Sequence, residues 1–103
     1  MAEVRVRKGQ RFAIDEDVVA DLVVERGGRA TVGGSVHGSL MAVGRVVVKK
    51  DVHGDVVAGS GARVVVMGDA RRDLTAGDRA RVVIGGTVSG RIASRSDLVI
   101  GFG

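Results

Sequence analysis

Residues 80–92 read Ala-Arg-Val-Val-Ile-Gly-Gly-Thr-Val-Ser-Gly-Arg-Ile, and this stretch decides the fold because its pattern recurs along most of the chain. Three mainly aliphatic residues precede a short, usually glycine-containing turn, and further aliphatic residues stand four and eight positions after the triplet. The triplets end at positions separated by 18, 16, 18, 18 and 16 residues: Ile14, Val32, Val48, Val66, Ile84 and Ile100. The chain is therefore an internal repeat, and the repeat length identifies the architecture.

This repeat predicts an all-β, single-domain parallel β-helix of five to six coils, each 16–18 residues long. Within a strand, Val82 and Ile84 face the interior and Val83 faces outward, because side chains alternate between the two faces. A two-residue change in coil length preserves this phase, whereas a one-residue change would reverse it. We expect the β-helix over residues 12–103, with residues 1–11 as an N-terminal segment or a cap strand. A right-handed coil is expected from the general preference of parallel crossovers.

The composition fits one small β-rich domain. The chain has 103 residues, of which 45% are hydrophobic, and β-branched valine dominates. It contains no cysteine, which excludes disulfides and thiolate zinc sites and favours the cytoplasm. The first ten residues alternate charge with valine, so no signal peptide is expected, and no apolar run is long enough to span a membrane.

No constellation for catalysis, a cofactor or a metal stands out, so a non-enzymatic protein is expected. His37 and His53 occupy equivalent outward positions and should stack, which suggests either a surface metal or anion site or a solvated polar ladder. Two imidazoles without a third assured ligand favour the solvated ladder. The acidic turn at Asp15, Glu16 and Asp17 is interpreted as a solvated turn, because it lacks a cleft for acid–base chemistry.

The outward positions are more informative, because many are apolar where a solvated face would be polar. One such series lies in the triplets and another follows the leucine positions. Together they predict an interaction surface formed by Val47, Val65, Val83, Val99, Val23, Met41 and Val57. Alternatively, the strand around Val4 and Val6 folds back over one series. The open ends of a β-helix predict end contacts through Phe12, Ile100 and Phe102.

Three glycine-rich stretches carry a family resemblance. They are Val-Gly-Gly-Ser-Val-His-Gly-Ser-Leu at 32–40, Val-His-Gly-Asp-Val at 52–56 and Ile-Gly-Gly-Thr-Val-Ser-Gly-Arg-Ile at 84–92. With the triplets, they resemble the core of bactofilins, the bacterial polymer-forming cytoskeletal proteins, over about residues 12–103. This resemblance implies nucleotide-free filaments formed by end-to-end stacking, often near membranes. Val-Arg-Lys-Gly-Gln-Arg-Phe at 6–12 is similar to the entry of the β-helical C-terminal domain of the Min-system division inhibitor.

The sequence therefore predicts a structural protein that binds itself, as a homo-oligomer or filament, without a cofactor. The alternative is a rigid module that presents an apolar face to another protein, such as an inhibitor, immunity or division partner. Hexapeptide acyltransferases repeat strictly near 18 residues, and the 16-residue spacings argue against that enzyme class. The net charge of +4 includes a C-terminal excess of arginine, interpreted as a solvated face. Without stacking aromatics, nucleic acid is an unexpected partner, and no residue specifically supports membrane association.

Overall fold

The computed structural model describes residues 2–95 and 98–100 and shows an all-β parallel solenoid of about five turns. The described part contains no helix, and so none that could cross a membrane. Its overall dimensions are 27 × 24 × 24 Å. The strands are β1 (Glu3–Val6), β2 (Arg11–Ile14), β3 (Asp21–Val24), β4 (Arg29–Val32), β5 (Leu40–Ala42), β6 (Arg45–Val48), β7 (Val56–Ala58), β8 (Arg63–Val66), β9 (Leu74–Ala76), β10 (Arg81–Ile84), β11 (Ile92–Ser94) and β12 (Leu98–Ile100).

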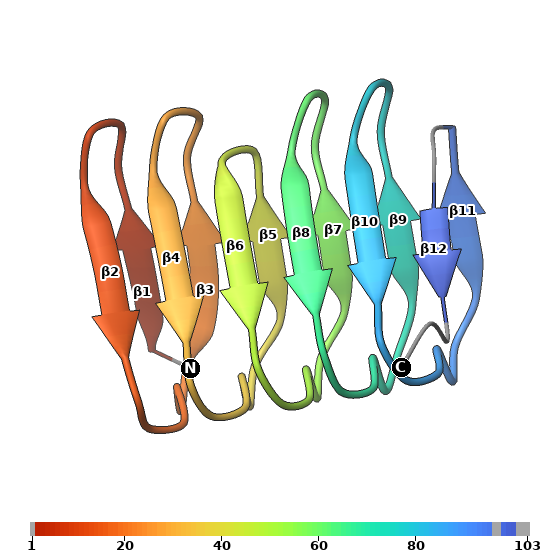
Figure 1. Ribbon diagram of the computed structural model, residues 1–103, viewed down its shortest axis with the longest axis horizontal. Coiled ribbons are helices and arrows are strands. Elements are labelled where there is room, and N and C mark those ends of the chain that lie inside the picture. Colours follow the sequence, from red (N-terminus) through yellow and green to blue (C-terminus); the bar gives the residue numbers. More distant parts are fainter. Residues whose placement is uncertain (1, 96–97, 101–103) are drawn as a thin grey trace.

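The strands form two parallel six-stranded sheets, so the predicted β-helix is confirmed. Odd-numbered strands pair in the order β1-β3-β5-β7-β9-β11, and even-numbered strands pair from β2 to β12 in the same way. In Figure 1 the even-numbered strands run downward in front and the odd-numbered strands run upward behind, while the chain advances from left to right. This path is a right-handed coil, as expected.

The third wall of the solenoid is much narrower than the two sheets. It consists of single-residue parallel bridges, one per coil, that join Val18, Val36, Val52, Ala70 and Val88 in series. These residues are the aliphatic positions four residues after each triplet, so they point inward as predicted. The turns on both sides of each bridge leave one paired residue per coil in this wall.

The core is a set of stacked aliphatic side chains along the solenoid axis. Leu22 pairs with Leu40, and Leu40 pairs with Val56, so one interior position stays filled through successive coils. Parallel pairing without slippage keeps every inward residue above its equivalent. The largest fully buried side chains are Leu22, Leu40, Leu74, Ile84, Val24, Val32, Val36, Val46, Val48, Val52, Val56 and Val64.

The coils differ in length at the corner that joins each odd-numbered strand to the next even-numbered strand. This corner has four residues at 7–10, 25–28, 59–62 and 77–80, but only Val43 and Gly44 between β5 and β6. In the four-residue corners the third residue takes a positive φ, which glycine adopts without strain, as at Gly27 and Gly61. Arg79 holds the equivalent position with a φ of 60°. The two-residue change leaves the phase of the strands intact, as predicted.

Residues at the N-terminus belong to the wall of the solenoid. β1 pairs in parallel with β3 as the edge strand of its sheet, and Val6 is buried in the core. The strand therefore lies beside β3, in the plane of the sheet, and does not fold back over an outward apolar series. Both outward faces remain uncovered by this segment.

Candidate functional site

The outward residues of the odd-numbered sheet form a shallow apolar hollow. Val23, Met41 and Val57 stand at equivalent positions of β3, β5 and β7. Met41 is 42% exposed and Val57 38% exposed. They line a hollow of about 290 Å³ together with Val43 of the short corner. The sequence-predicted residues of this sheet are thus brought together.

The predicted residues of the even-numbered sheet lie in a separate row on another face. Val47, Val65 and Val83 pair in series on β6, β8 and β10, and each is half-buried. The side chain of Val99 lies outside the described residues. Val47, Val65 and Val83 each lie two residues after the arginine that begins their strand, so this face is apolar along its middle and basic along one side.

The two ends of the solenoid are apolar but chemically unequal. At one end Val4, Phe12 and Ile14 are half-buried against the core. At the other end Ile92 is 47% exposed and Ile100 is 36% exposed. Phe102, the other predicted end residue, lies outside the described residues. Among the described strands, β1 and β2 are the edges of the two sheets at the first end, and β11 and β12 at the second.

The narrow wall carries two ladders of side chains that accept backbone hydrogen bonds from the next coil. In one ladder the Asp17 carboxylate accepts from the Ser35 N–H and the Asp51 carboxylate from the Asp69 N–H, each at 2.8 Å. The Asp69 carboxylate accepts from the Thr87 N–H at 2.9 Å. The second ladder repeats this arrangement four residues later, with Asp21, Ser39, Asp55 and Asp73 as acceptors. These contacts satisfy backbone donors that the single-residue bridges leave unpaired.

The two histidines stack on this wall as predicted. The ring centroids of His37 and His53 are 4.5 Å apart with the planes tilted by 54°. His37 Nε2 lies 2.8 Å from Asp17 Oδ2. The hydrogen bond with His37, followed by that from the Ser35 N–H, holds the pKa of Asp17 below its ordinary value. The described residues contain no group of three acidic or histidine side chains that could share a metal.

The contacts of the Asp51 carboxylate predict that the stability of the solenoid depends on pH. Its pKa lies below the ordinary value of 3.8, chiefly because it accepts the Asp69 N–H and also because Arg71 lies 3.0 Å away. A lowered folded-state pKa gives stability that is present above the ordinary value and lost as the pH falls through the folded value. Asp51→Asn should therefore lower the free energy of unfolding at pH 7, and its difference from the wild type should shrink below about pH 4. Urea unfolding at several pH values measures this; a difference independent of pH would contradict it.

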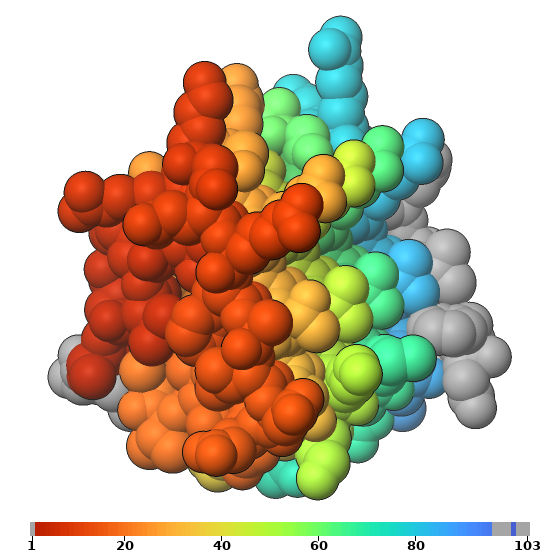
Figure 2. All heavy atoms as spheres, turned by 60° about the vertical axis from the view of Figure 1, so that its left-hand side comes forward, coloured from red at the N-terminus to blue at the C-terminus, as the bar shows by residue number. Residues whose placement is uncertain are grey.

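The most regular polar feature is a ladder of arginines at the start of the even-numbered strands. Arg11, Arg29, Arg45, Arg63 and Arg81 are paired in register from β2 to β10, and all are exposed. We call this set the arginine ladder. Equivalent side chains of successive coils project in rows along the molecule (Figure 2). The arginine ladder was not predicted from the sequence, although the sequence contains the pattern that indicates it. The residue before the triplet is arginine in five coils of six.

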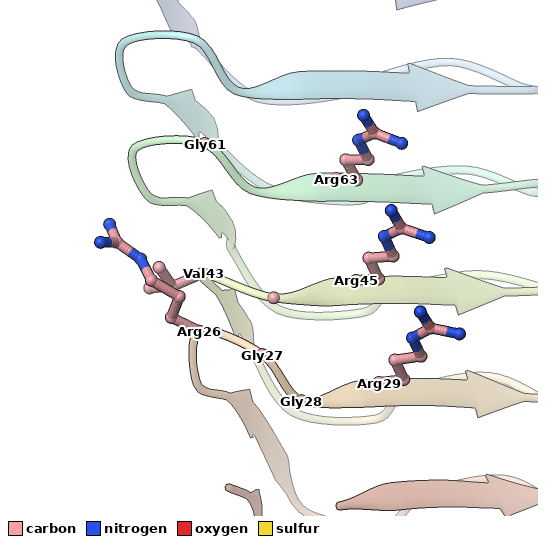
Figure 3. A pocket seen from close by; sticks show the side chains of 9 residues that line it. Arg26, Gly27, Gly28, Arg29, Val43, Arg45, Gly61 and Arg63 are labelled. Atoms are coloured by element: carbon pink, nitrogen blue, oxygen red, sulfur yellow. The ribbon is translucent and has the colours of Figure 1, made fainter. Parts of the chain in front are cut away.

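A notch interrupts the corner beside this ladder. Because the Val43–Gly44 corner is two residues shorter than its neighbours, it is set back between them (Figure 1). The resulting cavity has a volume of about 420 Å³, and its arginine side chains are Arg26, Arg29, Arg45 and Arg63. Figure 3 shows Arg29, Arg45 and Arg63 side by side on successive strands and Arg26 on the corner. The arrangement is suited to binding anions rather than to covalent chemistry.

Comparison of the chain with protein-family models, with curated proteins and with solved structures found no match in any of the three.

Proposed function

We propose that this protein is a non-catalytic structural element that assembles head to tail through the ends of its solenoid. The observation that carries the proposal is that, among the described residues, no further strand pairs with the edge strands of the two sheets, and these edges lie over apolar side chains. The edge strands are β1 and β2 at one end and β11 and β12 at the other. Open edges are templates for pairing with another chain. The resemblance of the glycine-rich stretches to bactofilin cores supports the same conclusion.

The parallel arrangement makes the two ends complementary. Every strand of a sheet runs in the same direction, so β11 of one copy presents the edge that β1 of the next copy requires. Continuing the observed register would place Ile92 against Val4 and Ile100 against Ile14, since each pair belongs to one series of equivalent positions. Because the two contacting ends differ, the contact is heterologous, and without a closing rotation it generates a filament.

The test is to place a charge on the exposed residue of one end. Ile92→Lys should abolish assembly without unfolding the protein, because Ile92 is 47% exposed yet would be buried by the next copy. Met67→Lys is the control, since Met67 is 52% exposed and directly follows β8, an interior strand of its sheet, away from both ends. Sedimentation velocity and negative-stain microscopy measure assembly. A wild-type protein that stays monomeric at tens of micromolar, or an Ile92→Lys variant that still assembles, would refute the proposal.

A second candidate function is a module that binds another protein through the apolar hollow of the odd-numbered sheet. It is favoured by the exposure of Met41 and Val57 in one hollow beside the ion pair of Arg5 with Glu25, 3.0 Å long. A polar rim around an apolar centre is typical of protein interfaces. Binding of a defined partner should then be lost on Met41→Asp and retained by Ile92→Lys, which separates this function from assembly.

A further inference from the structure

Charge is distributed very unevenly over the surface. Ten of the sixteen lysines and arginines lie at the odd-to-even corners or in the arginine ladder, and every one of the ten is exposed. We call this set the basic edge. The described corners contain two acidic residues, Glu25 and Asp78, and Glu25 pairs with Arg5. The basic edge consists of Arg7, Lys8, Arg11, Arg26, Arg29, Arg45, Arg63, Arg79, Arg81 and Arg95.

The arginine ladder is unfavourable for a protein without an anionic partner. Parallel strands lie about 4.8 Å apart, so each guanidinium has like-charged neighbours at directly opposite positions. Such pairs destabilise a sheet. None of the ten side chains forms an ion pair with a described residue. The arginine ladder is therefore a row of positive charges along the solenoid axis that no described acidic side chain neutralises.

The chemistry of the edge favours phosphate over other anionic partners. Arginine presents a planar fork of donors that matches phosphate oxygens, and the notch brings Arg26, Arg29, Arg45 and Arg63 around one cavity. A lipid surface is a poorer fit, because peripheral membrane sites combine basic with apolar side chains. The valines beside the arginine ladder, Val47, Val65 and Val83, are half-buried. Among the described residues, the large apolar side chains that are exposed all lie elsewhere: Val19, Met41, Val57, Met67, Ile92 and Ile100.

A second copy of this chain is also a poorer fit. Six of the eight acidic residues of the narrow wall and its flanking turns already accept hydrogen bonds from backbone N–H groups, and two of the six pair with His37 and Arg71. Five basic residues are interleaved with eight acidic ones on that wall and its flanking turns. The remaining negative charge is small compared with the charge of the basic edge.

We propose that the basic edge binds the phosphate backbone of a duplex nucleic acid without reading its sequence. Four steps of about 4.8 Å extend the ladder over about 19 Å, which corresponds to about five to six base pairs. The lack of stacking aromatics excludes recognition of unstacked bases but not contacts to phosphates. The site acts in single copies of the protein, so it does not depend on head-to-tail assembly.

The test compares two triple variants with equal changes in net charge. Arg29→Gln, Arg45→Gln and Arg63→Gln together remove the centre of the basic edge. Lys49→Gln, Lys50→Gln and Arg72→Gln together remove the same charge from the other side of the solenoid. Binding of a fluorescent 20-base-pair DNA duplex is measured by anisotropy between 50 and 200 mM salt, in the wild type and in the Ile92→Lys background. Melting curves verify that each variant is folded.

The basic-edge variant should lose about 1,000-fold in affinity at 50 mM salt, because each of the three lost phosphate contacts costs about tenfold there. The slope of log K against log salt should become less steep by about 2.7, from three contacts of about 0.9 ions each. The control variant should lose far less, and duplexes of different sequence should bind equally.

The proposal would be overturned by no binding of the wild type at 50 mM salt, by equal losses of affinity in both variants, or by an unchanged slope. It would also be overturned by tighter binding to vesicles containing anionic lipid than to the duplex, with the vesicle binding lost in the basic-edge variant. The last result would assign the edge to a membrane surface. Competition by inorganic polyphosphate that exceeds competition by unlabelled duplex at equal phosphate would also overturn it, because the edge would then bind phosphate chains in general.

Discussion

Leu40→Ala is expected to lower the free energy of unfolding by about 3 kcal/mol. Leu40 is fully buried in β5 and lies in register between Leu22 and Val56 of the adjoining coils. Removing its branched end leaves a cavity in the middle of the solenoid, where fixed strand spacing limits collapse of the neighbouring coils. The loss should appear as a lower urea midpoint with little change in slope.

The matched control is the next residue of the same strand. Met41 points outward and is 42% exposed, so Met41→Ala should cost well under about 1 kcal/mol. Equal losses for the two variants would mean that the inward and outward phases of β5 are wrongly assigned. That result would contradict the fold itself, because one phase error would propagate through every paired coil.

Gly86→Ala is expected to cost about 2 kcal/mol through a mechanism specific to the narrow wall. A Cβ at position 86 would collide with the Asp69 carboxylate oxygen that accepts the Thr87 N–H. The carboxylate would have to move and give up this charge-assisted bond. Arg72 occupies the equivalent position above Asp55, and the hydrogen bond there is longer, 3.2 Å.

A double-mutant cycle separates this collision from other effects of the methyl group. Asp69→Ala removes the acceptor and should itself destabilise the protein, but Gly86→Ala in that background should cost much less than in the wild type. A coupling of about 1 kcal/mol or more, from chemical denaturation of the four proteins, is expected. Additive costs would show that the glycine is required for some reason other than the acceptor of the preceding coil.

The fold could be predicted because aliphatic residues recur periodically at the inward positions of the sequence. Leu22, Leu40 and Val56 must stay aliphatic and in phase, and a spacing of 16 or 18 residues preserves that phase. The narrow wall was harder to predict, since Val36 and Val52 have the same pattern whether they belong to strands or to single bridges. The difference arises from hydrogen bonds to Asp and Ser side chains, which apolar periodicity does not report.

The arginine ladder shows why surface sites were the weaker part of the prediction. The inward aliphatic residues define the repeat, and an outward residue such as Arg45 contributes nothing to its periodicity. Once the coils are in register, the series is readable from the sequence alone. The notch is different, because the sequence places a two-residue deletion before Val46 but does not show that the corners on both sides project beyond it.

The variable corner also bears on how such a chain can diverge. Insertions and deletions confined to the odd-to-even corner leave the strands of every coil in register, as the Val43–Gly44 corner demonstrates. The outline of this edge can therefore change by single genetic events while the interior remains as it was. A shortened corner leaves a recess in the edge, and a lengthened corner projects from it. Chains with this fold can therefore differ in surface shape while the packing of the core is unchanged.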